Sequence, residues 1–203
     1  MRLAGTVAAL ALLAAGCGTA RPSLAARAPI HGGLADAPVE VPRPATVQGQ
    51  VKEVIAAAGP IYLSGQPSEA ALRELVAGGV TVVVNLRTPE EMADRAQVPF
   101  DEEALVKSLG ASYVHVPLGG KDHPYTPAAV DEVARALAAH QGKALLHCTV
   151  AWRASHMWAA YLVRHRGVPV ATALEHARAV NAGTRWPMAD LLDADVALEP
   201  RGR

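Results

Sequence analysis

ALLHCTVAWRASHMWAAYL, residues 144–162, is the stretch from which the rest of this 203-residue chain is best interpreted. A short apolar run ends at His147-Cys148, four residues follow, and Arg153 opens a segment with apolar residues at helical spacing. Where a strand passes into a helix, the loop points several backbone N–H groups at one place, and the helix dipole adds positive charge there. The stretch therefore predicts a buried strand, an anion-holding loop and a core-facing helix.

The loop combines a potential nucleophile with a potential anion clamp. Arg153 carries a planar guanidinium that can hold two oxygens of an oxyanion at once. The same positive field favours the thiolate of Cys148. We expect His147 to support that thiolate and Ser155 to be the nearest hydroxyl beyond the arginine, although His147 and Trp152 also fit purely structural roles. The expected oxyanion-binding residues are Thr149, Val150, Ala151, Trp152 and Arg153.

Strands and helices alternate along most of the chain. This alternation predicts an α/β domain with a mainly parallel central sheet and helices on both faces. Ligands in such sheets bind at the carboxyl ends of strands, which is where Cys148 lies. Expected strands cover 61–66, 80–86, 112–118 and 143–148, and expected helices follow Ser68, Thr88, residue 100, Thr126, Arg153, Pro169 and, more weakly, Trp186.

The N-terminus has the layout of a secretory signal. MRLAGTVAALALLAAGC, residues 1–17, has a basic start and an apolar run, and its end resembles a bacterial lipobox, so we expect Cys17 to carry lipid. An ordinary signal peptide or an anchoring helix is the alternative, but the run is shorter than the ~20 residues that span a membrane. We expect a flexible Pro-rich tether at 18–50, the domain at 51–195 and a tail at 196–203, which predicts an exported lipoprotein on the periplasmic side of a membrane or the cell surface.

Charge and composition exclude several other classes of protein. Lys plus Arg and Asp plus Glu number 19 each, so no net field favours a nucleic-acid partner. The two cysteines are too few for a disulfide scaffold, and lipid on Cys17 leaves Cys148 unpaired. The histidines are scattered without the spacing of metal ligands, so we expect no metal and no cofactor.

Three motifs carry a family resemblance over roughly residues 52–182. They are Ser-Gly-Gln-Pro at 64–67, Asn-Leu-Arg at 85–87, and the His-Cys…Arg loop. With them the chain resembles the bacterial protein tyrosine phosphatase-like family, which is related to the phosphatase-like domain of beta-lactamase hydrolase-like proteins. The resemblance implies the cysteine-based dual-specificity phosphatase fold, with Cys148 as nucleophile and Arg153 as phosphate binder.

The resemblance also implies a two-step hydrolysis of a phosphorylated protein or a small phosphomonoester. The Cys148 thiolate attacks phosphorus while a carboxylic acid protonates the leaving oxygen and then activates water. Asp122, in PLGGKDHPYTP at 117–127, is the natural acid because it follows a strand end and two glycines, and His123 is the substitute.

Two departures from the usual phosphatase loop keep other functions open. Four residues rather than five separate Cys148 from Arg153, which also suits a rhodanese-like sulfurtransferase that carries sulfur on the cysteine. Ala151 stands where related loops have Gly, and a positive φ there would cost on the order of 1 kcal/mol. The alternatives are therefore a sulfurtransferase, or a catalytically degenerate domain that binds an anion or a partner.

Overall fold

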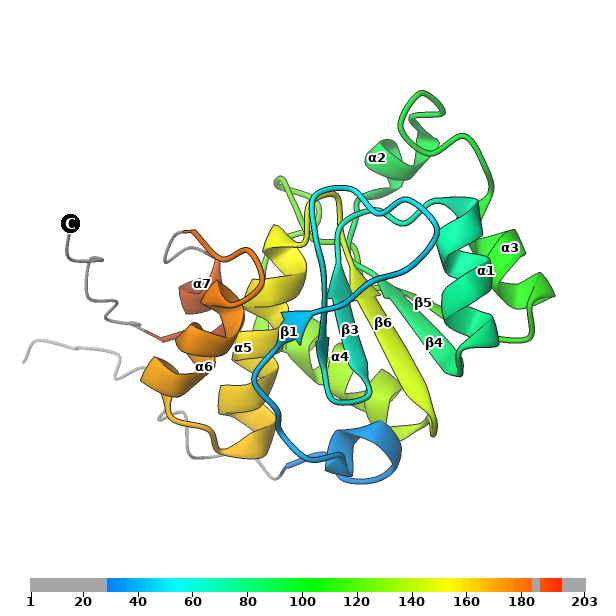
Figure 1. Cartoon of the computed structure of the whole chain (residues 1–203). Coiled ribbons are helices and arrows are strands. Elements are labelled where there is room, and N and C mark those ends of the chain that lie inside the picture. Colours follow the sequence, from blue (N-terminus) through cyan, green and yellow to red (C-terminus); the bar gives the residue numbers. More distant parts are fainter. Residues whose placement is uncertain (1–28, 184–186, 195–203) are drawn as a thin grey trace, which may run out of the picture.

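A six-stranded sheet in the order β1-β2-β3-β6-β4-β5 forms the centre of the molecule, with helices on both faces (Figure 1). The structure is a computed structural model that describes residues 29–183 and 187–194. Strands β3, β6, β4 and β5 are mutually parallel, and β1 and β2 join antiparallel at one edge. The mainly parallel α/β fold predicted from the sequence is confirmed. The strands are β1 (Arg43–Pro44), β2 (Ile55–Ala58), β3 (Ile61–Ser64), β4 (Val80–Asn85), β5 (Ser112–His115) and β6 (Lys143–His147).

Strand β4, at the centre of the sheet, is buried on both faces. Its β-branched run is covered on both sides, because Val82 and Val84 pack into the cluster under α4 and α5 while Val83 packs into the cluster under α1 and α3. All three side chains have no exposed surface. The continuous apolar run seen in the sequence therefore belongs to a central strand between two helical layers.

The helices begin at the caps that the sequence marks. Ser68 accepts from Ala71 N, and Thr126 accepts from Ala129 N. Thr88 and Glu91 form the expected capping box. Within the described residues, none of the helices has the length and apolar character needed to span a bilayer. They are α1 (Glu69–Ala77), α2 (Pro89–Ala93), α3 (Glu102–Ser108), α4 (Pro127–Ala138), α5 (Trp152–Arg166), α6 (Val170–Arg178) and α7 (Met188–Leu192).

The expected tether differs from the structure between residues 29 and 50. A 3-10 helix, η1 (Gly33–Asp36), buries Leu34 in the main core, and β1 pairs with β2. Tyr161 Oη donates to Ala35 O (3.2 Å), which fastens η1 to α5. The sequence of this segment shows no hydrophobic periodicity, because only short parts of it contact the domain: η1 packs against α5, and β1 pairs with β2. The domain therefore begins before the expected boundary at residue 51. The expected signal peptide at 1–17 with its lipid on Cys17, and the expected tail at 196–203, lie outside the described residues.

Candidate active site

The loop from Cys148 to Arg153 lies between the carboxyl end of β6 and the start of α5, as the sequence predicts. The turn after β3 supports it from one side. Cys148 N donates to Ser64 O (3.2 Å), and Gln66 N donates to Thr149 O (3.0 Å). The side chain of Cys148 is only 1% exposed, so the candidate nucleophile is covered by the groups around it.

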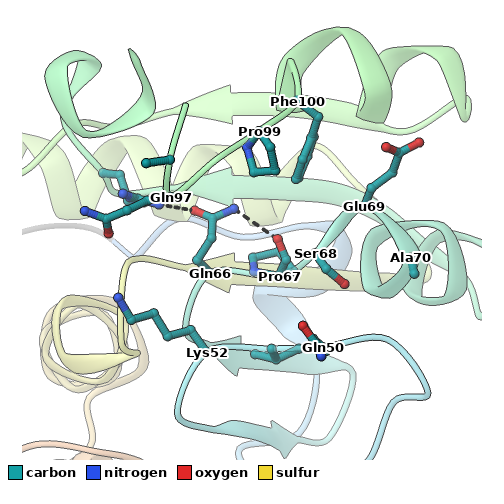
Figure 2. A pocket seen from close by; sticks show the side chains of 13 residues that line it. Gln50, Lys52, Gln66, Pro67, Ser68, Glu69, Ala70, Gln97, Pro99 and Phe100 are labelled. Carbon is teal, nitrogen blue, oxygen red and sulfur yellow. Dashed lines mark hydrogen bonds between the residues drawn. The ribbon is translucent and has the colours of Figure 1, made fainter. Parts of the chain in front are cut away.

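Gly65 explains the Ser-Gly-Gln-Pro motif. A Cβ atom at this position would lie 1.9 Å from Lys52 O and 3.0 Å from Thr149 O, so only glycine lets two backbone segments meet here. Lys52 and Gln66 accordingly lie on adjacent segments (Figure 2), joined by a hydrogen bond from Lys52 N to Gln66 O (2.9 Å). The motif thus allows the backbone at Lys52, at Gly65 and at Thr149 to pack closely together beside the cysteine loop.

Ala151 adopts the left-handed conformation, which is one of the two reasons for a glycine at this position. Its φ is 63° and its ψ is −1°, and it precedes the first residue of α5. Ser155 Oγ donates to Ala151 O (2.8 Å) and Trp152 O (2.9 Å). The Ser155 hydroxyl therefore contacts the backbone of the loop, and its expected role as a supporting hydroxyl stays a prediction.

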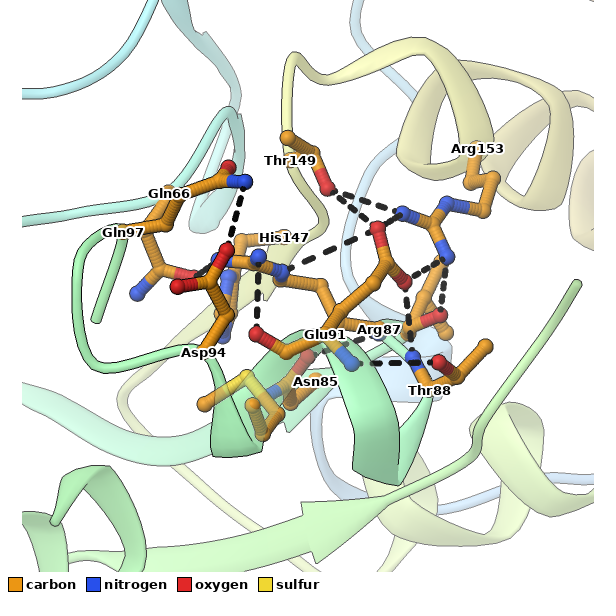
Figure 3. A network of polar contacts seen from close by, with 12 residues as sticks. Gln66, Asn85, Arg87, Thr88, Glu91, Asp94, Gln97, His147, Thr149 and Arg153 are labelled. Carbon is orange, nitrogen blue, oxygen red and sulfur yellow. Dashed lines mark hydrogen bonds and ion pairs between the residues drawn. The ribbon is translucent and has the colours of Figure 1, made fainter.

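The guanidinium of Arg153 is held on its outer edge (Figure 3). Nη1 donates to Glu91 Oε2 (2.7 Å), and Nη2 donates to Glu91 Oε1 (2.6 Å) and Thr149 Oγ1 (2.9 Å). Nη1 also donates to the carbonyls of Leu86 (3.2 Å) and Leu118 (2.7 Å). Among the described residues Nε donates to no protein acceptor, so Nε is the guanidinium nitrogen that remains for a ligand.

Glu91 is the site residue that sequence reasoning missed. It was recognised only as part of a capping box, in which Thr88 N donates to Glu91 Oε2 (2.8 Å). Burial alone would raise its pKa, but hydrogen bonds from Arg153, Thr88 and Thr149 outweigh burial and lower the pKa to about 2. Glu91 is therefore ionised across the working pH range. One sequence signal could have revealed Glu91. It lies shortly after the carboxyl end of the predicted strand 80–86, and the Arg153 loop is expected at the same end of the sheet.

A second guanidinium lies behind the first. Arg87 is 1% exposed, and its Nη1 donates to Gln66 Oε1 (2.6 Å) while its Nη2 donates to Glu91 O (3.1 Å). Burial lowers the pKa of Arg87, and the nearby charge of Glu91 opposes this. Arg87 and Arg153 thus place two guanidinium groups around Glu91 at the carboxyl edge of the sheet.

His147 contacts a carboxylate beneath the loop. Its Nε2 lies 2.9 Å from Glu102 Oε1, and neither side chain is exposed. Glu102 also accepts from Gln66 Nε2 (2.5 Å) and Asn85 Nδ2 (3.1 Å). Burial would raise the pKa of Glu102, but the interactions with His147 and Gln66 lower it. The ring of His147 thus belongs to a buried polar network, and its expected support of the thiolate remains a prediction.

The structure brings the expected general acid and the arginine to one cavity. A hollow of about 520 Å³ is lined by Asp122, His123, Arg153, Glu91 and other residues of the two loops. Gly119 N donates to His123 O (2.7 Å), which closes the turn that exposes Asp122. In the part of the chain that is described, no group of three or more His, Cys, Asp or Glu side chains is placed to hold a metal ion.

Comparison with known proteins agrees with this geometry. A family model described as "DSP-PTPase phosphatase fused to NAD+ Kinase" matches residues 41–188. The chain belongs to this family. It is a protein tyrosine/dual-specificity phosphatase-like hydrolase, so the family resemblance carried by the three motifs is confirmed. No curated protein matches the chain.

Solved structures give the same fold. A putative phosphatase (DUF442) from Shewanella putrefaciens CN-32 is 26% identical over 70% of this chain and 90% of that chain, with a TM-score of 0.54. Tk-PTP in its active form (22% identity, 66% and 90% coverage, TM-score 0.55) and KAP with its catalytic-site cysteine replaced by serine (18%, 65% and 83%, 0.54) share the fold. The three structures share the fold, and the family model supports a cysteine-based phosphatase.

Proposed function

We propose that this chain is a cysteine-dependent phosphomonoester hydrolase of the bacterial cell envelope that works through a phosphocysteine intermediate. One observation carries the proposal. Glu91 accepts hydrogen bonds from both terminal nitrogens of Arg153, whose Nε has no acceptor among the described residues, and Arg153 ends a loop that begins with Cys148. A phosphoryl group placed there meets the arginine edge, the loop amides and the nucleophile together.

In the first step the Cys148 thiolate attacks phosphorus in line with the leaving oxygen. The S–P bond forms and the P–O bond to the leaving group breaks, while Arg153 and the loop amides hold the other three oxygens. Asp122 gives its proton to the leaving oxygen, and its position in the cavity of Arg153 supports this role. His123, in the same turn, is the substitute acid.

In the second step water attacks the phosphocysteine. The S–P bond breaks, the thiolate of Cys148 is restored and inorganic phosphate leaves. Asp122, ionised after the first step, takes a proton from the attacking water. Arg153 and the loop amides hold the phosphate oxygens in this step as in the first.

An envelope location is part of the proposal and rests on the signal-like N-terminus. The fold is compatible with a lipid on Cys17, because the chain enters the domain far from the site. Leu34 N donates to His140 O (2.8 Å) just before the amino end of β6, whereas Cys148 follows its carboxyl end. In Figure 1, η1 and the start of α5 accordingly lie at opposite ends of the sheet. The described chain thus begins near the end of the sheet opposite the site, which is compatible with an anchor that precedes it.

The test uses the full chain in mild detergent with para-nitrophenyl phosphate between about pH 5 and pH 7.5, a range in which carboxylic acid catalysts operate. Thiosulfate-to-cyanide sulfur transfer and the Cys148→Ser variant run alongside. We expect phosphate release from the wild type and none from Cys148→Ser. Sulfur transfer without phosphate release would favour the sulfurtransferase, and silence in both assays from folded protein would favour a binding domain without turnover.

A further inference from the structure

A second, larger cavity adjoins the cysteine loop. It has a volume of about 940 Å³ and lies between three segments, 50–52, 66–70 and 96–100 (Figure 2). Two of its lining residues, Gln66 and Arg87, also contact the site already described. Gln66 N bonds Thr149 O, and Arg87 Nη2 bonds the carbonyl of Glu91. The cavity therefore shares a wall with the place where the phosphoryl group is expected to bind.

Positive charge exceeds negative charge in the lining of this cavity, with Lys52 and Arg87 against Glu69. Lys52 is exposed, lines the cavity and forms no ion pair among the described residues. The N-terminus of α1 opens into it at Glu69 and Ala70, where the first helical amides have no partner within the helix. The carboxylate of Glu69 is engaged by Arg73 Nη2 (2.7 Å) and Nε (3.2 Å). A cavity with this lining favours the binding of an anion.

Arg87 places a buried positive charge in the wall of the cavity. Its side chain is 99% buried, and among the described residues its Nε makes no hydrogen bond but forms an ion pair with Glu91 Oε1 at 4.0 Å. Because Arg87 also lines the cavity, its charge adds to the attraction of an anion that binds there.

The rest of the lining suits the body of a small organic molecule. Pro67, Pro99 and Phe100 form an apolar wall, and Gln50 and Gln97 present amide side chains. Apolar and aromatic surface with a few polar groups is the usual composition of a small-molecule site.

We propose that this cavity is a substrate subsite for small phosphomonoesters that carry a second phosphate. The reacting phosphate occupies the Cys148 loop, the body of the molecule packs along Phe100, and the second phosphate lies between Lys52 and the N-terminus of α1. The role of the Cys148 loop rests on the proposed function. The anion preference of the cavity rests only on its own residues.

Binding to the full-chain Cys148→Ser variant tests the subsite without turnover. Calorimetry with adenosine 3′,5′-bisphosphate, adenosine 3′-monophosphate and adenosine 5′-monophosphate compares ligands that differ by one phosphate. We expect the bisphosphate to bind at least about tenfold tighter than either monophosphate, as a charge-assisted contact provides. Equal affinity for all three would overturn the proposal.

Charge variants locate the second phosphate. Lys52→Gln should remove roughly three- to tenfold of the bisphosphate preference and Lys52→Glu should remove more, with little change for the monophosphates. Lys107→Gln is the matched control, because Lys107 is an exposed lysine that pairs with Glu103 on α3. A preference that survives both Lys52 variants would show that the second phosphate binds elsewhere, which contradicts the subsite.

The subsite and the proposed function fail in different ways. A bisphosphate preference that depends on Lys52 in a chain that never releases phosphate would support the cavity and contradict the hydrolase. Phosphate release that depends on Cys148, without any bisphosphate preference, would support the hydrolase and overturn the cavity proposal.

Discussion

Replacing Glu91 by Gln tests whether this carboxylate positions Arg153 for phosphate or competes with phosphate for Arg153. Glu91 contacts Arg153 at 2.6 and 2.7 Å and accepts from Thr149 Oγ1 at 2.8 Å. The variant keeps the shape but removes the charge and one acceptor. If Glu91 positions Arg153, loss of a charge-assisted contact of about 2 kcal/mol lowers kcat/KM roughly 30-fold. If Glu91 competes with phosphate, kcat/KM rises instead.

Steady-state kinetics with para-nitrophenyl phosphate, together with Kd for inorganic phosphate, separate these outcomes. Glu103→Gln is the control, because Glu103 is an exposed glutamate that pairs with Lys107 on α3. It should leave both constants within twofold, on the order expected for an exposed ion pair. Faster turnover and tighter phosphate binding in Glu91→Gln would refute the positioning role.

The same substitution changes acid stability in a direction fixed by linkage. The pKa of Glu91 is lowered from 4.5 to about 2 in the folded protein. Its stabilisation is therefore fully present above pH 4.5 and is lost as the pH falls toward 2. Discounted for partial exposure, it amounts to about 2 kcal/mol. Denaturant titrations at several pH values should show a shallower acid decline for Glu91→Gln, and parallel curves would contradict the assignment.

Three further substitutions probe the loop and its support. Asp122→Asn should lower kcat by about 100-fold and raise KM little, measured at the pH optimum, because it removes the acid but not the anion clamp; unchanged kcat would transfer the role to His123. Ala151→Gly should raise the free energy of unfolding by about 0.5 kcal/mol by relieving the left-handed strain, read from urea titrations. Gly65→Ala should lower it by about 2 kcal/mol or more, because the new Cβ meets Lys52 O; a stable variant would show that the two segments can separate.

The sequence predicts the sheet and its loop because their signals are local. The β-branched run at 80–86, the caps at Ser68 and Thr126 and the helical period after Arg153 each need only a few adjacent residues to be recognised. The segment 29–50 was wrongly expected to be a tether because its order comes from distant contacts. Leu34 is ordered by the core under α4, and β1 by its pairing with β2.

In the site as well, the residues of a single loop could be recognised from the sequence, whereas contacts between distant segments could not. Cys148 and Arg153 belong to one loop and could be singled out from adjacent residues, whereas the positive φ of Ala151 was only one of two possibilities. The contact of Glu91 with Arg153 could not be predicted, because the two residues lie 62 positions apart in the sequence. The role of Glu91 in a helix cap also accounted for its position without any contact to the site. The partners of His147 and Arg87 likewise come from other segments, and only the fold brings Glu102 and Gln66 to them.

Detection of a phosphoryl group on Cys148 is the most direct test of the proposed chemistry. The full chain would be mixed with para-nitrophenyl phosphate, quenched in acid within the first turnover and analysed by peptide mass spectrometry. We expect the peptide that contains Cys148 to gain the mass of one phosphoryl group, and we expect this species to be absent from Cys148→Ser. Phosphate release that persists in Cys148→Ser, or a phosphoryl group found only on another residue, would contradict a phosphocysteine mechanism.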